Sequence, residues 1–317
     1  MNYSVSEFLK KKTINGWYLF WLISGPVSIA MIVAMLVGDL STGQGVSSMI
    51  QLSVRCAVPC LYVAFSASSL HALFSSDLTA WTLRNRKYFG LCFAVAMAWQ
   101  ALFILWMVGV FTDYYVNEVY LLKDAIEGVA GYIFLIPMIL TTFSFGRKRI
   151  SRKHWKLLHK SGIYFLWAYA FGVYWWAIFY YSNPGFIDYA FYWAGFLAWG
   201  LRAAAWTKIR LELAEKDPSK DALKPLARPI GVLVVGVGVV AASFGSAWRE
   251  SAEELLYDYT FTRIPEAYLP YWPFEPFLPL VIIALGSYLI GTSRQGKAPA
   301  KASRTDGRAA ANSPPSH

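Results

Sequence analysis

The sequence predicts an all-α fold, a polytopic membrane bundle of about eight transmembrane helices with both termini in the cytoplasm. Three observations predict it. Of the 317 residues, 56% are hydrophobic and only 15% are charged, whereas about a quarter of the residues are charged in soluble domains. Apolar runs long enough to cross a bilayer, about 20 residues each, recur along the chain. The loops between these runs alternate in charge, and this alternation indicates membrane orientation.

Eight apolar runs are expected to form the transmembrane helices. They cover residues 16–38, 49–74, 88–111, 126–146, 159–181, 186–206, 229–248 and 274–292. The first run is long and lacks the small-residue cleavage pattern of a signal peptide, so we expect a retained helix.

Lysine and arginine gather in alternate connections: the N-terminal segment, residues 84–87, residues 147–160 and residues 208–228. The connections between these are acidic or lack cations. Because cationic loops remain in the cytoplasm, eight helices with both termini inside satisfy the positive-inside rule at every loop. The net charge of +10 therefore indicates orientation in the inner (plasma) membrane and a lipid bilayer as partner, and we expect no nucleic-acid partner.

Five regions follow from this pattern. We expect a cytoplasmic N-terminal segment, a six-helix core, a cytoplasmic linker, two additional helices with an aromatic outer loop, and a disordered cytoplasmic tail. They cover residues 1–15, 16–208, 209–228, 229–292 and 293–317. The outer loop, residues 250–276, is rich in Tyr and Trp, which is typical of a lid on the outer surface or of an ordinary aromatic belt.

The seventh predicted helix carries small residues four positions apart. Gly238, Ala242 and Ser246 follow this spacing, which lets helices approach closely. The pattern predicts a packing face, either within the chain or against a partner in a membrane complex.

Two of the four histidines, His71 and His159, are candidates for a cofactor site. His71 lies near the end of the second predicted helix and His159 at the start of the fifth. Both ends are expected at the cytoplasmic face, so the imidazoles should lie at similar depth. Two such histidines can hold one b-type haem as axial ligands. The alternative is two polar residues at the headgroup boundary. His154 and His317, in a basic loop and the tail, are expected to be solvated.

Two arginines lie within predicted helices. Charge inside a bilayer normally faces protein, water or a cofactor, so Arg55 is expected to pair with an outer acid, a haem propionate or a lipid headgroup. Arg202 lies close enough to the helix end to snorkel. The cysteines Cys56, Cys60 and Cys92 have no zinc or disulfide spacing and are expected to be buried hydrophobes. No dinucleotide or phosphate-loop motif is present, so any electron donor would be a separate protein or a quinol.

Three segments resemble the ferric-reductase-like transmembrane domain family. Residues 86–91 (RKYFGL) are similar to the start of its third helix, residues 155–160 (WKLLHK) with Tyr164 to the start of its fifth, and residues 200–202 (GLR) to its end. Within the family, the chain is similar to the haem-bearing membrane subunit of the bacterial methionine sulfoxide reductase system. The resemblance covers about residues 16–208.

The resemblance implies b-type haem bound by histidines of the third and fifth helices. His159 matches one ligand, but the other positions hold Gln100 and Gly172, which are not ordinary haem ligands. The implied haem would therefore use His159 with a new partner, for which His71 is the intramembrane candidate, or the fold would have lost its haem.

Two functions follow. The first is a membrane electron-transfer subunit, part of an oxidoreductase. It would bind a single haem b through His159 and His71, with Arg55 as a further cofactor contact, and pass electrons from a flavoprotein or quinol to an outer-side acceptor. The alternative is a haem-free structural or assembly subunit built on the same fold, with Gly238, Ala242 and Ser246 contacting its partner. A small-solute transporter is disfavoured, because no inverted repeat is evident.

Overall fold

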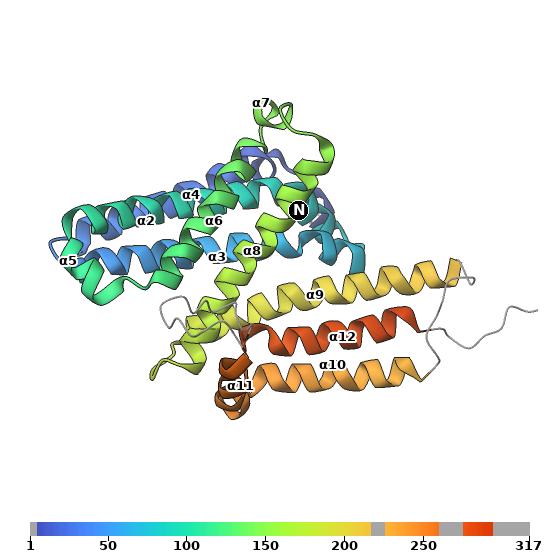
Figure 1. Cartoon of the computed structure of the whole chain (residues 1–317). Coiled ribbons are helices and arrows are strands. Elements are labelled where there is room, and N and C mark those ends of the chain that lie inside the picture. Colours follow the sequence, from blue (N-terminus) through green and yellow to red (C-terminus); the bar gives the residue numbers. More distant parts are fainter. Residues whose placement is uncertain (1–4, 217–225, 260–274, 294–317) are drawn as a thin grey trace, which may run out of the picture.

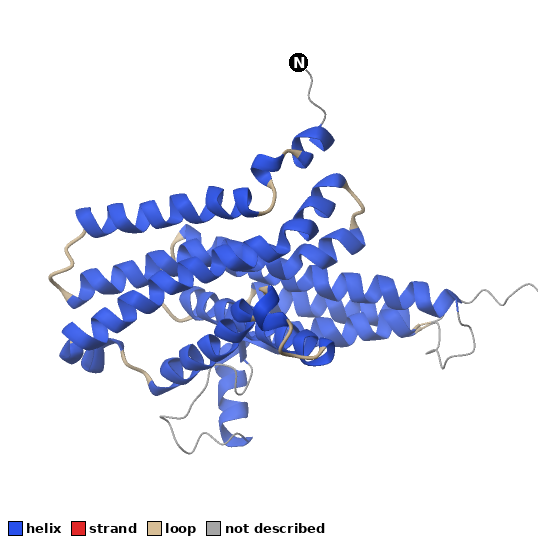
Figure 2. Ribbon diagram, turned by 90° about the horizontal axis from the view of Figure 1, so that it is seen from above, coloured by secondary structure: helices blue, strands red, loops and turns tan. Residues whose placement is uncertain are grey.

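The structure, a computed structural model, describes residues 5–216, 226–259 and 275–293. Within these ranges the chain is all-α, as the sequence predicts (Figure 2). A long helix lies at each of the eight predicted positions. These helices are α2 (Trp17–Val37), α3 (Gly43–Leu73), α4 (Asp77–Val110), α6 (Leu122–Leu140), α8 (Arg152–Phe179), α9 (Phe186–Lys216), α10 (Ala227–Ser243) and α12 (Leu278–Thr292).

Shorter helical segments connect them. They are α1 (Val5–Lys10), η1 (Lys12–Ile14), α5 (Thr112–Tyr114), η2 (Tyr115–Val119), α7 (Ser144–Arg147), α11 (Gly245–Tyr259) and η4 (Glu275–Phe277).

The chain is a multi-pass membrane protein. Among the described residues, five helices are long and apolar enough to cross a bilayer, namely α2, α3, α4, α8 and η4 joined to α12, and a bent pair of α10 with α11 could add a sixth. The helix α6 carries Lys123, Asp124 and Glu127 in its first turns, so its apolar stretch is short. The helices α2 and α4 expose large apolar side chains that are compatible with lipid, such as Trp21, Leu36 and Leu105.

Three helices begin six or more residues earlier than the sequence predicts. The helix α3 begins at Gly43 instead of 49, α4 at Asp77 instead of 88, and α8 at Arg152 instead of 159. All three starts are capped: the Thr42 hydroxyl accepts the N–H of Gly45, Ser76 forms a capping box with Thr79, and the Ser151 hydroxyl accepts the N–H of His154. Such caps satisfy the first backbone donors of a helix, and they stabilise polar first turns that an apolar pattern does not detect.

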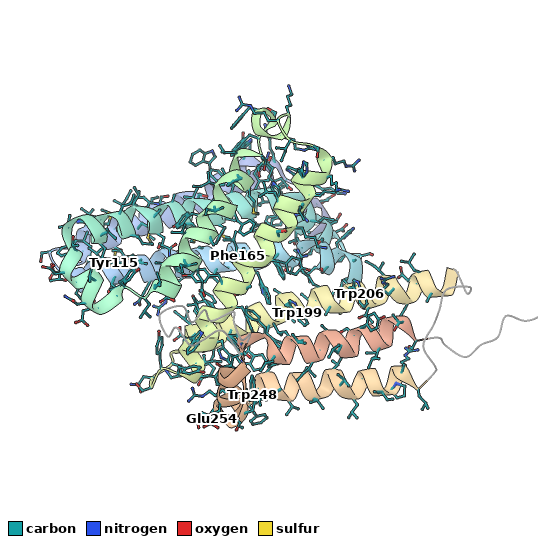
Figure 3. The ribbon with its side chains drawn as sticks, viewed as in Figure 1. Tyr115, Phe165, Trp199, Trp206, Trp248 and Glu254 are labelled. Atoms are coloured by element: carbon teal, nitrogen blue, oxygen red, sulfur yellow. The ribbon has the colours of Figure 1, made fainter. Side chains whose placement is uncertain are left out.

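The helix α3 lies at the centre of the bundle. It packs along α4 and, on its other sides, against α9 and α8. Helices α9, α12 and α10 lie side by side as one layer, and α6 and α8 cross the bundle at a slant (Figure 1). The main core cluster joins these parts and is rich in aromatic side chains, with Phe65, Trp175 and Tyr192 fully buried. The labelled Trp199 and Trp206 lie in the middle part of α9 (Figure 3).

Glycines allow α10 and α12 to touch backbone to backbone. A Cβ at Gly231 would lie 2.7 Å from the carbonyl oxygen of Gly286, and one at Gly286 would lie 2.6 Å from that of Gly231. A Cβ at Gly238 would meet Ile283 at 2.5 Å. The small-residue face predicted on this helix therefore packs within the chain, against α12, at Gly238.

The third member of that predicted face lies elsewhere. The helix ends at Ser243, and α11 turns away from it by 92°. Ser246 is therefore exposed on α11, whereas Ala242 is buried on α10, so the four-residue repeat is not one continuous surface. The continuous helix expected at 229–248 is corrected to two.

The predicted linker is also partly helical. The helix α9 continues to Lys216, beyond the expected boundary at 208. Of the predicted aromatic outer loop, α11 covers the first part up to Tyr259 and η4 the end. Residues 260–274 of that predicted lid and residues 294–317 of the predicted tail lie outside the described residues.

Candidate functional site

A cavity of about 530 Å³ lies between α3, α4, α6, α8 and α9. Its volume is within the range of pockets that enclose a small molecule, about 300–1,000 Å³. It is formed by the C-terminal parts of α3 and α6, the N-terminal parts of α4 and α8, and Arg202 of α9. These helix ends belong to the face where the sequence gathers lysine and arginine, which we call the basic end of the bundle.

The cavity combines an apolar body with a cationic rim. Aliphatic and aromatic side chains line its interior, including Leu61, Leu91, Leu135, Ile139 and Leu166. Five basic side chains also line it. They are Arg86, Lys87, Lys156, Lys160 and Arg202.

The cations of this cavity are not neutralised by acids. None of the lining residues that the structure describes is Asp or Glu, and within the described ranges none of the five basic side chains forms an ion pair. Arg86 is near enough to Arg202 for their charges to interact. Four of the five are exposed at the rim, where water stabilises them. Arg202 is half-buried, so it is the cation that depends most on a counterion.

Arg202 is held rigidly at the cavity wall. Its Nε donates to the carbonyl oxygen of Phe65 at 2.9 Å. Its guanidinium carbon lies 4.0 Å from the ring centroid of Phe65 and 4.7 Å from that of Tyr164. Such stacking fixes the plane of a guanidinium. Arg202 therefore has a fixed, half-buried position at the cavity wall, and snorkelling to the membrane surface stays a prediction.

His159 lines the same cavity, but a hydrogen bond engages its Nε2 atom. This nitrogen lies 3.0 Å from the Thr141 hydroxyl, which donates its single hydrogen to the carbonyl oxygen of Pro137 at 2.6 Å. With that hydrogen on Pro137, the hydroxyl accepts from the Nε2–H of His159, and Nδ1 is the unprotonated nitrogen of this tautomer. The ring also packs on Trp155, with 4.4 Å between the centroids.

His71 lies outside the cavity lining. Its Nδ1 is 3.3 Å from the hydroxyl of Thr79, whose hydrogen goes to the carbonyl oxygen of Phe74. This capping turn between α3 and α4 therefore holds the His71 ring. His71 lies near the C-terminus of α3 and His159 near the N-terminus of α8, and of the two only His159 lines the cavity. Their common depth in the membrane stays a prediction.

These placements do not bring His71 and His159 to one cavity, as a haem held between them would require. Such a haem needs one unprotonated ring nitrogen from each histidine, on opposite sides of the iron. His159 lines the cavity, with Nε2 at Thr141, whereas His71 lies outside the lining, with Nδ1 at Thr79.

The two positions where the family resemblance implies ligands are part of helix packing. Gln100 of α4 is buried, and its side-chain oxygen accepts from the Tyr132 hydroxyl of α6 at 3.1 Å. The same hydroxyl lies 2.9 Å from the carbonyl oxygen of Met97. Gly172 is buried in α8. A hydrogen-bonded bridge thus joins α4 and α6 at the position of the implied third-helix ligand.

Arg55 does not belong to the cavity. It is exposed on α3, on the opposite side of Pro59 along the helix from the cavity residue Leu61. The structure therefore brings together His159 and Arg202 of the residues that the sequence singled out, and leaves Arg55 and His71 apart from them.

Sequence reasoning missed four lining cations, Arg86, Lys87, Lys156 and Lys160. Their pattern was visible, because two basic clusters open two consecutive predicted cytoplasmic helix starts. We interpreted these clusters as orientation signals and as part of the motifs that resemble the ferric-reductase-like family. What could not be seen is that α4, α8 and α9 bring them to one cavity.

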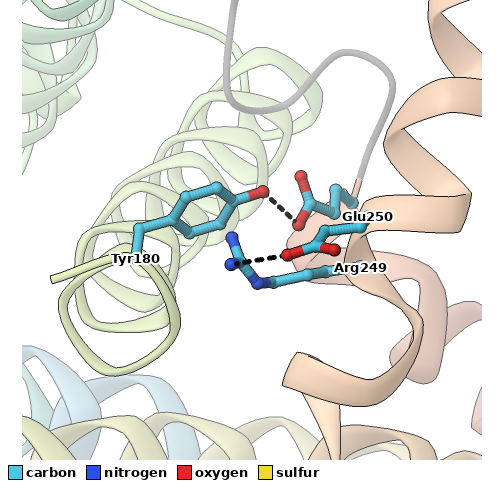
Figure 4. Close-up of polar contacts among 4 residues, drawn as sticks. Tyr180, Arg249 and Glu250 are labelled. Carbon is cyan, nitrogen blue, oxygen red and sulfur yellow. Dashed lines mark hydrogen bonds and ion pairs between the residues drawn. The ribbon is translucent and has the colours of Figure 1, made fainter. Parts of the chain in front are cut away.

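A second polar cluster lies around the bend between α10 and α11 (Figure 4). The Tyr180 hydroxyl donates to Glu275 Oε1 at 2.6 Å, and Glu275 is fully buried. The guanidinium carbon of Arg249 lies 4.1 Å from the Tyr180 ring centroid, and its Nη2 is 3.3 Å from Glu250. The cation of this cluster, Arg249, has an acidic partner within the protein, so we interpret the cluster as structural.

The chain matches no family model, no curated protein and no solved structure. The resemblance to the ferric-reductase-like transmembrane domain therefore stays a prediction that rests on residues 86–91, 155–164 and 200–202.

Proposed function

We propose that this chain is an eight-span protein of the inner membrane, with both termini in the cytoplasm, that binds an anionic amphipathic molecule in the cavity at its basic end. The observation that carries the proposal is the cavity itself, where five cations without acidic partners border an apolar interior. A half-buried cation is stabilised by an anion, and the apolar interior would take a hydrocarbon or aromatic body.

The proposed topology rests on loop charge. The connection after α2 contains Asp39 and no cation, whereas the connection before α8 is strongly basic. Single cysteines introduced as Asp39→Cys and Lys153→Cys should react with a membrane-impermeant maleimide from opposite sides, Lys153→Cys from the cytoplasm. The native cysteines are replaced by alanine or serine first, because all three are free thiols. Labelling of both positions from one side would contradict the topology.

The binding function can be tested by native mass spectrometry of the protein in a neutral detergent. We expect hexadecanoate and hexadecyl phosphate to form adducts that hexadecanol does not form. Lys156→Gln should weaken both anionic adducts by about threefold to tenfold, since it removes one cation of the rim. Lys153→Gln is the matched control, because Lys153 is exposed in the first turn of the same helix but does not line the cavity. Equal adducts of hexadecanol would contradict the proposal.

Electron transfer through a single haem b is the second candidate. One observation favours it: His159 lines a cavity whose cations could pair with propionates. It requires an unprotonated ring nitrogen of His159 at the iron and a second ligand from outside the lining. When bound, haem would supply one-electron chemistry, with a flavoprotein or a quinol as donor. A reduced-minus-oxidised spectrum with pyridine haemochrome quantification distinguishes the two: sharp b-type bands at one haem per chain, lost in His159→Ala, would favour this candidate.

A structural or assembly role through Gly238, Ala242 and Ser246 is less well supported. Gly238 contacts α12, Ala242 is buried, and Ser246 faces away on α11. A partner would need another surface.

A further inference from the structure

Resting on the proposed anion-binding function, we propose that the ligand is a lipid phosphomonoester, with its phosphate at Arg202 and the basic rim and its hydrocarbon chain in the apolar interior of the cavity. The chemistry of the lining residues distinguishes this class from carboxylate lipids and from free phosphate.

The amount of positive charge favours phosphate. Five cations border the cavity, and no described acid lines it. A phosphomonoester carries about −1.5 to −2 charges near neutral pH and three acceptor oxygens. A carboxylate carries one charge and two oxygens. The phosphate can therefore interact with more of the five cations at once.

The geometry of Arg202 also favours phosphate. Its Nε is already used by the carbonyl oxygen of Phe65, and the rings of Phe65 and Tyr164 hold the guanidinium plane. No described residue accepts a hydrogen bond from its two terminal nitrogens. These nitrogens form a preorganised pair of donors that matches two phosphate oxygens. Lysines at the rim supply mobile point charges around the same group.

The interior favours a lipid over free phosphate. Leu61, Leu91, Leu135, Ile139 and Leu166 come from four helices and line the same cavity as Arg202. A soluble phosphate would bind only the rim and leave this apolar surface in contact with water, which is unfavourable. A hydrocarbon chain would cover it.

The test compares ligands with one chain and different heads. Affinities of the full-length protein for hexadecyl phosphate, hexadecanoate and inorganic phosphate are measured by calorimetry at constant neutral detergent. We expect hexadecyl phosphate to bind at least about tenfold more tightly than hexadecanoate, in line with stronger charge-assisted bonding. Inorganic phosphate at millimolar concentration should neither bind nor compete.

The variant Arg202→Lys keeps the charge but removes the paired donors. It should reduce the preference for phosphate to within about threefold and leave the affinity for hexadecanoate nearly unchanged. If this variant does not fold, Lys160→Gln replaces it: Lys160 is an exposed lining residue, and its loss should weaken hexadecyl phosphate more than hexadecanoate. Lys153→Gln is again the control.

Each contrary outcome has a separate meaning. Equal affinity for the two hexadecyl anions overturns the phosphomonoester and leaves the proposed anion-binding function in place. Competition by inorganic phosphate means that the source is soluble phosphate and overturns the lipid. Absence of binding by both hexadecyl anions overturns the proposed function together with this inference.

Discussion

The two polar regions of this membrane protein use arginine in opposite ways. Near the α10–α11 bend, Arg249 lies on the Tyr180 ring and contacts Glu250, and Tyr180 in turn binds the buried Glu275. At the basic end, Arg202 is equally well positioned, but the charges around it are all positive. The difference teaches that a charge within a membrane protein indicates a ligand where the protein does not supply its counterion. Position within the bilayer alone does not make this distinction.

The largest expected effect on stability is in the polar cluster near the α10–α11 bend. Glu275→Ala removes the fully buried acceptor of the Tyr180 hydroxyl and should lower the free energy of unfolding by about 2–3 kcal/mol, since hydrogen bonds to charged groups are strong. Denaturant unfolding in detergent measures it. Glu250→Ala is the control, because that carboxylate is 78% exposed and should cost less than about 1 kcal/mol. Weakened anion binding by a folded Glu275→Ala protein would show that the two regions are not independent.

The next largest effect on stability is expected at the contact between α10 and α12. Gly231→Val places a side chain against the carbonyl of Gly286 and should lower the free energy of unfolding by about 1–3 kcal/mol through overpacking. Gly236→Val is the control on the same helix, because no atom lies within 4 Å of a Cβ there. Equal stability of the two variants would contradict the described packing.

The hydrogen-bonded bridge between α4 and α6 should contribute less to the free energy of unfolding than the α10–α12 contact. Tyr132→Phe removes the hydroxyl that contacts Gln100 and Met97. We expect a loss of about 0.6 kcal/mol, the usual size of an interhelical hydrogen bond in a membrane, and no change in anion affinity. A new haem spectrum or a large loss of anion binding in this variant would show that the bridge has a role beyond packing.

The smallest stability effect has the opposite sign. Arg86→Gln removes repulsion between Arg86 and Arg202, so the free energy of unfolding without ligand should stay equal or rise by up to about 0.5 kcal/mol. Anion binding should weaken at the same time, because the variant removes a cation that lines the cavity. A charge that serves function often lowers stability. A clear loss of stability would mean that the basic end is a structural cluster like the other one, and the comparison would fail.

Much of the fold could be predicted from the sequence, since eight apolar runs mark the eight long helices. The early starts of α3 and α4 could not, because their first turns are polar and depend on caps at Thr42 and Ser76. The bend at Phe244 was also missed. The apolar run simply continues through it, and only contacts of Gly245 with Trp175 and Phe179 of α8 mark the turn.

The candidate site was predicted only in part. His159, which the sequence identified as a candidate, lines the cavity, whereas His71 does not. Depth along a helix does not fix the direction in which a side chain points around the axis, so it could not tell that His71 binds Thr79 outside the cavity. Likewise, the sequence shows each basic cluster on its own helix. It does not show that Arg86, Lys156 and Arg202 line one cavity, because this depends on how three helices pack.

The most direct test of the central claim is the affinity of the purified, full-length protein for hexadecyl phosphate compared with hexadecanol, in one neutral detergent, for the wild type, Lys156→Gln and Lys153→Gln. The account predicts that only the anionic ligand binds, and that Lys156→Gln weakens it while Lys153→Gln does not. Equal binding of the neutral ligand, or equal losses in the two lysine variants, would contradict a cationic cavity that selects an anionic amphipathic molecule.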